Sequence, residues 1–85
     1  MILNDDYLNN IQSRQDLAVF LRELLKDYQQ NSTNWENPEL YGYLEALERF
    51  IQDLDGYFLN RGEDVPEQPT WKLFAEILLS AKYYE

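Results

Sequence analysis

The sequence predicts an all-α fold, specifically a small antiparallel domain of three helices. Three stretches carry apolar residues at steps of three and four, which is the period of an amphipathic helix. Each stretch follows a residue that commonly starts a helix, and polar or proline-containing segments separate the stretches. The 85 residues, 45% of them hydrophobic, are enough for one domain with a single core.

A short additional helix before residue 13 is also compatible with the spacing. Asn4 or Asp5 is suited to cap such a helix with a side-chain oxygen. Its apolar positions would be Leu3, Tyr7, Leu8 and Ile11.

The first long helix is expected over residues 14–30. Ser13 is a suitable N-cap, because Asp16 three residues later approximates the capping-box pattern. Residues 31–34 form a short polar loop, so the next helix is expected to pack against this one as an antiparallel neighbour. The apolar positions of the helix are Leu17, Phe20, Leu21, Leu24, Leu25 and Tyr28.

Residues 35–62 are expected to supply the central helix, over residues 38–60. Asn37 followed by Pro38 predicts its start, because the Asn side chain can cap the first turn and Pro fits the first helical position. At 1.5 Å per residue the helix would be about 34 Å long. Its two apolar stripes would contact both neighbours. The stripes are Leu40, Leu44, Leu47, Ile51, Leu54 and Phe58, and beside them Tyr43, Phe50 and Tyr57.

Gly42 and Gly56 lie inside this expected helix, where glycine is unfavourable. Either they let a neighbouring backbone or ring come close, or the helix ends near Asp55 and residues 57–59 fold over the core. We favour the continuous helix, and in both cases Gly62 is expected at the C-terminal cap.

The last helix is expected over residues 71–83, with Thr70 as its cap. Residues 63–69 before it hold two prolines and three acids, which is typical of an extended connector. Trp35 and Trp71 stand at helix starts, where an indole ring can fix the direction of the incoming chain.

The residue inventory argues against most catalytic chemistry. The chain has no cysteine and no histidine, so thiolate zinc sites, Cys nucleophiles and the commonest general base are absent. An EF-hand comparison with Gly56 in the sixth position places Ile51 first and Gly62 twelfth, where ligands are needed. We therefore expect no enzyme, no cofactor and no metal. A magnesium site built from carboxylates such as Glu45, Glu48, Asp53 and Asp55 is a less favoured alternative.

The charge of the chain restricts its partners. A net charge of −9 disfavours direct binding of nucleic acid or of anionic membranes, because both need Lys and Arg. The first residues lack the pattern of a secretory signal, and no apolar run approaches the roughly 20 residues that span a bilayer. A cytoplasmic location is expected.

Tyrosines and acids suggest where a partner protein binds. Tyr83 and Tyr84 cannot both face one core, and exposed Tyr is frequent in protein interfaces. With Tyr41 they are the predicted aromatic contacts, and Glu45 and Glu48 are the predicted acidic contacts.

The chain resembles a small family of uncharacterised bacterial proteins over residues 13–85. The resemblance rests on four motifs and a closing Ala-Lys-x-Tyr-Glu. The motifs are Trp-Glu-Asn (Trp35 to Asn37), Tyr-Leu-Glu-Ala (Tyr43 to Ala46), Asp-Gly-Tyr (Asp55 to Tyr57) and Pro-x-x-Pro-x-Trp-x-x-Phe-Ala (Pro66 to Ala75). The resemblance implies a family and no activity.

The leading functional hypothesis is a small acidic module that binds another protein, as adaptors and immunity-type inhibitors do. An alternative from a second class is a nucleic-acid mimic that occupies the basic groove of another protein. A metal-dependent enzyme is a weaker alternative, and self-association through the broad apolar faces is a fourth.

Overall fold

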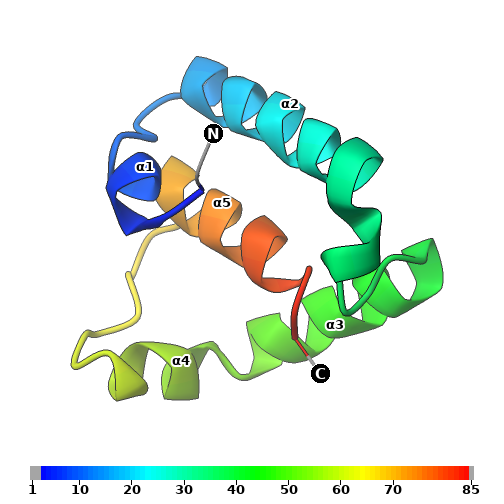
Figure 1. Cartoon of the computed structure of the whole chain (residues 1–85). Coiled ribbons are helices and arrows are strands. Elements are labelled where there is room, and N and C mark those ends of the chain that lie inside the picture. Colours follow the sequence, from blue (N-terminus) through cyan, green and yellow to red (C-terminus); the bar gives the residue numbers. More distant parts are fainter. Residues whose placement is uncertain (1–2, 85) are drawn as a thin grey trace.

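α5 (Trp71–Ser80) occupies the centre of this computed structural model, which describes residues 3–84 (Figure 1). α1 (Asp5–Asn9), α2 (Arg14–Asn31) and α3 (Leu40–Gln52) all pack against it. A 3-10 turn, η1 (Ser32–Asn34), follows α2, and α4 (Leu54–Asn60) follows α3. Residues 3–84 contain helices and no strand, so the predicted all-α class is confirmed.

The order of packing differs from the expectation. No Cα atom of α2 lies within 8 Å of a Cα atom of α3 within the described residues, so the prediction that they pack against each other as antiparallel neighbours is wrong. α5 lies between them and packs on both (Figure 1). Its buried residues Leu73 and Ala75, with Ala81 just beyond it, explain this position, because small and branched apolar side chains let neighbours approach closely.

Three helix starts are capped as the sequence predicts. The side chain of Asn4 accepts a hydrogen bond of 3.0 Å from the backbone N–H of Tyr7, and this cap confirms the short α1. Ser13 accepts from Asp16 N–H at 3.1 Å, and the Asp16 carboxylate accepts from Gln12 N–H at 3.0 Å. At the start of α5, the Thr70 hydroxyl accepts from the backbone N–H of residue 73 at 2.9 Å.

The continuous helix predicted over residues 38–60 is wrong, because the chain bends at Asp53 between α3 and α4. The break lies close to Asp55, where the less favoured alternative placed it, and Phe58 beyond it is buried, although Leu59 stays exposed. Gly56 itself lies inside α4, and no close neighbour explains it. A Cβ built on Gly56 meets no atom within 4 Å, and at Gly42 the nearest atom is Asn37 Oδ1 at an ordinary 3.6 Å. The bend instead follows from packing, since it lets the Tyr57 hydroxyl donate to the Glu76 carboxylate of α5 at 3.1 Å.

Gly62 ends α4 as predicted. Its φ of +71° is the left-handed conformation that glycine adopts most easily. Gly62 N–H donates to Leu59 at 3.0 Å and Glu63 N–H donates to Phe58 at 2.9 Å, which together form a Schellman motif. α5, in contrast, ends at Ser80, three residues earlier than expected, and residues 81–83 form turns.

The main core joins α1, α2 and α5 on one side of the molecule. Phe20 is fully buried at its centre and tilts against Tyr7 with ring centroids 6.2 Å apart. The buried residues of this cluster are Leu8, Ile11, Phe20, Leu24 and Ala75. Only one face of α2 packs in this core. The adjoining face of the helix stays accessible to other contacts.

Candidate functional site

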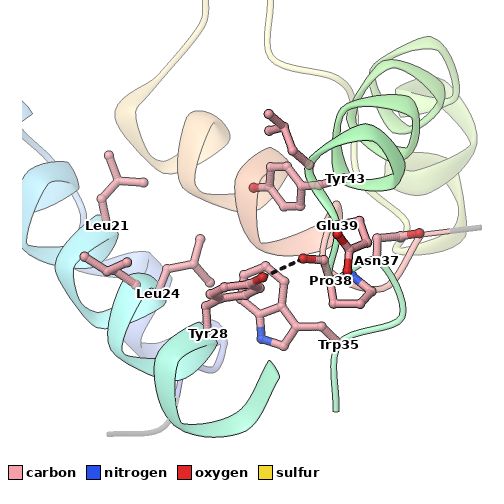
Figure 2. Close-up of a pocket in the computed structure, with 10 residues that line it drawn as sticks. Leu21, Leu24, Tyr28, Trp35, Asn37, Pro38, Glu39 and Tyr43 are labelled. Atoms are coloured by element: carbon pink, nitrogen blue, oxygen red, sulfur yellow. Dashed lines mark hydrogen bonds between the residues drawn. The ribbon is translucent and has the colours of Figure 1, made fainter. Parts of the chain in front are cut away.

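An apolar groove lies between the C-terminal half of α2 and the start of α3 (Figure 2). Its volume is about 340 Å³. Glu39 is the only charged residue on its walls among the described residues. The groove is lined by Leu21, Leu24, Leu25, Tyr28, Trp35, Asn37, Pro38, Glu39, Leu40 and Tyr43.

Helical periodicity places the α2 wall. Leu21, Leu25 and Tyr28 follow one another at steps of four and three, so they form a single stripe beside the core-facing Phe20 and Leu24. The exposed fractions are 42% for Leu21, 49% for Leu25 and 39% for Tyr28. From the opposite wall Leu40 is 72% exposed. Such a group of large exposed aliphatic side chains beside a groove is typical of a binding surface.

Aromatic rings join the two walls. Trp35 lies between Tyr28 and Tyr43, with ring centroids 5.0 Å from the first at 75° and 6.0 Å from the second at 31°. The Tyr28 hydroxyl donates a hydrogen bond of 2.8 Å to the carbonyl oxygen of Pro38 across the groove (Figure 2). On the far side, the half-buried Tyr43 donates to the Leu78 carbonyl at 2.7 Å. These bonds hold the groove in a defined shape.

A partly buried ion pair fixes Trp35. The Lys82 ammonium lies 2.7 Å from Asp27 Oδ2, and the same oxygen accepts from the Trp35 indole N–H at 2.8 Å. Lys82 Nζ also lies 5.5 Å from the Trp35 ring centroid, within the range of a cation–π contact. The hydrogen bond from Lys82 is the main cause that lowers the pKa of Asp27. Burial is the largest single influence on Lys82 and opposes its charge, but the interactions with Asp27 and Tyr83 together outweigh it, so the pKa of Lys82 is raised.

Asn37 has a different role from the predicted one. α3 begins after Glu39, which makes no side-chain cap, so the expected cap of α3 by Asn37 is wrong. Asn37 Nδ2 instead donates to the carbonyl oxygens of Ala81 at 3.1 Å and Tyr84 at 2.7 Å. It therefore caps the C-terminal end of α5, where carbonyl groups lack helical partners. This contact fixes the start of α3 to the central helix.

The predicted contact residues lie outside the groove, at two separate places. Tyr41, Glu45 and Glu48 are exposed on one face of α3, at helical steps of four and three, and Tyr41 is 76% exposed. The structure thus brings these three together. Tyr83 is 53% exposed, and the Lys82 ammonium lies 4.7 Å from its ring centroid.

Tyr84 is partly buried rather than fully available. Its ring meets Phe50 edge-on, with centroids 5.4 Å apart, and its hydroxyl donates to the Asp53 carboxylate. Tyr83 and Tyr84 therefore sit beside the bend between α3 and α4, whereas the groove lies at the other end of α3.

Sequence reasoning placed Leu21, Leu25, Tyr28 and Leu40 on apolar helix faces expected to pack against neighbouring helices, and so missed the groove. Periodicity reports that a residue is apolar on one side of a helix, but not whether a neighbour covers it. The sequence did contain one indication of the groove. The apolar faces of α2 and α3 are wider than the area that α5 alone can cover.

The groove offers apolar contact and no reactive group. The hydroxyls of Tyr28 and Tyr43 and the Asn37 amide already bond to the backbone, the Trp35 indole bonds to Asp27, and Glu39 supplies the one carboxylate of the described lining. Among residues 3–84 no three Asp or Glu side chains are grouped so that they could hold a metal ion. The arrangement is chemically suited to binding an apolar surface.

Comparison with known proteins gives a family and no activity. None of the helices in the described part of the chain is both long enough and apolar enough to cross a bilayer. No curated protein and no solved structure matches the chain. The match to the family of unknown function DUF7660 extends over residues 13–85, nearly the whole chain, and the protein therefore belongs to that family.

Proposed function

We propose that this chain is a small binding module whose groove between α2 and α3 takes an amphipathic helix of another protein. The observation that carries the proposal is the groove itself, about 340 Å³ and walled almost entirely by apolar side chains. Leu25 on α2 and Leu40 on α3 both line it and remain 49% and 72% exposed. Their exposure costs free energy in the unbound protein, and a partner would relieve it. The cytoplasmic location and the bacterial source expected from the sequence are part of this proposal.

A helix is the occupant that fits the shape of the site. The groove runs between two helices whose backbones do not pack against each other, and a third helix can place side chains at steps of three and four between their exposed rows. The rows themselves are Leu21, Leu25 and Tyr28 on α2 and Leu40 with Pro38 at the start of α3. Complexes of this kind seat the apolar face of an amphipathic helix against such a hydrophobic groove.

The charge of the segment that holds α3 indicates a basic partner. Glu39 lines the groove and Glu36 precedes it closely in the chain, while Glu45, Glu48, Asp53 and Asp55 follow farther along α3 and α4; Arg49 is the one base in residues 36–55. None of these six acids belongs to an ion pair within the described residues. A partner helix with Lys or Arg flanking its apolar face would therefore gain electrostatic attraction and faster association.

The same charge disfavours the other occupants. Two copies of a chain with a net charge of −9 repel each other, which opposes self-association through the groove. A nucleic-acid mimic needs a continuous acidic face, but the bend at Asp53 separates Glu45 and Glu48 on α3 from Asp55 on α4. We therefore propose neither self-association nor nucleic-acid mimicry.

Site-specific photo-crosslinking in the native host tests the proposal. A photoreactive phenylalanine analogue replaces Leu40 in one variant and Leu59 in another. Leu59, on α4, is a matched control because it is 76% exposed and does not line the groove. We expect a defined partner to crosslink through position 40 and not through position 59, and the crosslinked peptide to be helical and basic.

Affinity measurements on the purified partner segment complete the test. Leu25→Ser and Leu40→Ser should each weaken binding at least about tenfold, since each removes a buried aliphatic side chain from the complex. Leu59→Ser should leave the affinity within about twofold of the parent. Equal effects at positions 40 and 59, or crosslinks from position 40 to a second copy of this chain only, would contradict the proposal.

A further inference from the structure

A second hollow lies beside the bend between α3 and α4, away from the groove. Its volume is about 580 Å³, and it lies between α3, α4 and the segment that follows α5. The aromatic rings of Phe50, Tyr57 and Tyr84 line it, together with the carboxylate of Asp53. The combination of aromatic walls and a carboxylate differs from the apolar lining of the groove, so a different ligand is expected.

The rings form the walls of a box. Tyr57 meets Phe50 with centroids 4.9 Å apart at 71°, and Tyr84 meets the same ring at 5.4 Å and 78°. The two tyrosine rings are therefore each nearly perpendicular to Phe50. Gly56 borders the hollow as well, and no atom lies within 4 Å of the position its Cβ would take. Its missing side chain keeps the hollow open.

The chain already places its own cations on Tyr57 and on Tyr83, both of which line the hollow. The Arg61 guanidinium carbon lies 5.3 Å from the Tyr57 centroid, and Lys82 Nζ lies 4.7 Å from the Tyr83 centroid. Aromatic faces attract such cations through the negative potential above the ring. Each contact uses one face of its ring. The local environment is thus suited to positive charge.

Asp53 supplies the negative charge. It forms no ion pair with any cation of the described residues, and Tyr84 donates a hydrogen bond to one of its oxygens. An ionised carboxylate has about four acceptor positions, so most of its capacity remains for a ligand. Ser80 and Asn60 add further acceptor oxygens at the border of the hollow.

From these observations we infer that the hollow beside the α3–α4 bend binds a guanidinium group. A planar guanidinium can stack on an aromatic ring and at the same time donate two parallel hydrogen bonds to a carboxylate. The walls and the acid at this site match both requirements. This inference stands independently of the groove, because the two hollows share no lining residue and take different ligands.

The group can come from an arginine side chain of a protein or from a small molecule, and two probes separate these sources. N-ethylguanidinium represents the small molecule. A pentapeptide with blocked ends and the sequence Gly-Gly-Arg-Gly-Gly represents the chain-borne group. The neutral control is the same peptide with citrulline in place of arginine, which keeps the shape and removes the charge.

Titrations followed by the backbone amide signals of the ¹⁵N-labelled protein provide the readout. We expect saturable shifts at Gly56, Asn60, Ser80 and Tyr84 with at least one guanidinium probe. Saturation by the pentapeptide alone indicates a protein source, by N-ethylguanidinium alone a small molecule, and by both a site that recognises only the group. The citrulline peptide should give no saturable shifts.

Two variants assign the binding to this hollow. Asp53→Asn should weaken binding about tenfold or more, because a hydrogen bond to a charged group is replaced by a neutral one. Asp55→Asn changes a carboxylate that does not line the hollow, and it should have no effect. Gly56→Leu should abolish binding by filling the space while Asp53 stays in place.

The inference fails on any of three results. Neither probe saturates at any accessible concentration, the citrulline peptide shifts the same amides equally, or Asp53→Asn and Gly56→Leu, both folded by circular dichroism, bind as tightly as the parent.

Discussion

Asp27 binds three other side chains beside the groove. Its carboxylate accepts from Lys82 at 2.7 Å, from the Trp35 indole at 2.8 Å and from Asn31 at 3.3 Å. Lys82 itself is 7% exposed, so its charge is largely removed from water. The ion pair connects α2 to the segment after α5 and holds the Trp35 ring in the wall of the groove.

Removal of this carboxylate should destabilise the fold. Asp27→Ala leaves a buried ammonium and an indole N–H without their acceptor, and we expect a loss of about 2–4 kcal/mol in the free energy of unfolding. Urea denaturation measures the loss. Glu63→Ala is the control, because Glu63 is 51% exposed and lies 3.8 Å from Arg61, so its loss should stay below about 0.5 kcal/mol. Equal losses for the two variants would show that the Asp27–Lys82 pair stabilises the fold no more than an exposed ion pair does.

The same pair predicts how stability depends on pH. The pKa of Asp27 in the folded protein is lowered from its ordinary 3.8, first by the hydrogen bond from Lys82, so the carboxylate stabilises the fold above pH 3.8. That contribution is lost as the pH falls through the folded-state pKa. Burial lowers the pKa of Lys82, but the interactions with Asp27 and Tyr83 together raise it above its ordinary 10.5. The Lys82 contribution is therefore present below pH 10.5 and is lost as the pH rises through the folded-state value.

Urea denaturation at pH 7 and pH 3 checks the acid side. The parent should lose more stability on acidification than Asp27→Asn, which has no carboxylate to protonate at this position. Parallel losses in the two proteins would contradict the assignment of this pH dependence to Asp27.

At the scale of single elements, the sequence predicted features that depend on neighbouring residues, but not those that depend on residues far away in the chain. Ser13, Thr70 and Gly62 act within four residues of themselves, so the sequence pattern is enough to identify them. Asn37 bonds to residues 81 and 84, which are 44 and 47 positions away, and no local pattern contains that information. The bend at Asp53 likewise depends on contacts of Tyr57 and Tyr84 with other elements.

The two glycines of α4 and its cap should respond oppositely to the same substitution. Gly56→Ala adds a methyl group in open space inside a helix and should stabilise the protein by about 0.5–1 kcal/mol. Gly62→Ala places a side chain at a φ of +71° and should destabilise it by about 1 kcal/mol. Thermal unfolding of both variants against the parent measures the difference. A stabilising Gly62→Ala would contradict the Schellman cap.

At the scale of the whole molecule, the sequence predicted the class but not the arrangement. Three helices with broad apolar faces can pack in several orders, and the breadth of a face does not say which helix is central. α5 takes that place and keeps α2 from α3 (Figure 1). The groove is a direct consequence of this arrangement, which is why it could not be predicted from any single helix.

The net charge of −9 should also affect the whole molecule. Like charges repel in the compact state, and added salt screens them over about 10 Å or less. The melting temperature at pH 7 should therefore rise by a few degrees between low salt and about 0.5 M NaCl. At the isoelectric point near pH 4.2 the same salt should have little effect. A melting temperature that falls with salt at pH 7 would show that the ion pairs outweigh the repulsion.

The central claim is that a partner helix occupies the groove rather than the face carrying Tyr41, Glu45 and Glu48. Amide and indole shift mapping on the ¹⁵N-labelled protein, with the helical segment recovered from the Leu40 crosslink, tests this claim most directly. We predict that the largest shifts fall on the amides of Leu21, Leu25 and Leu40 and on the indole N–H of Trp35. Shifts centred on Tyr41, Glu45 and Glu48, with the Trp35 indole unchanged, would contradict it.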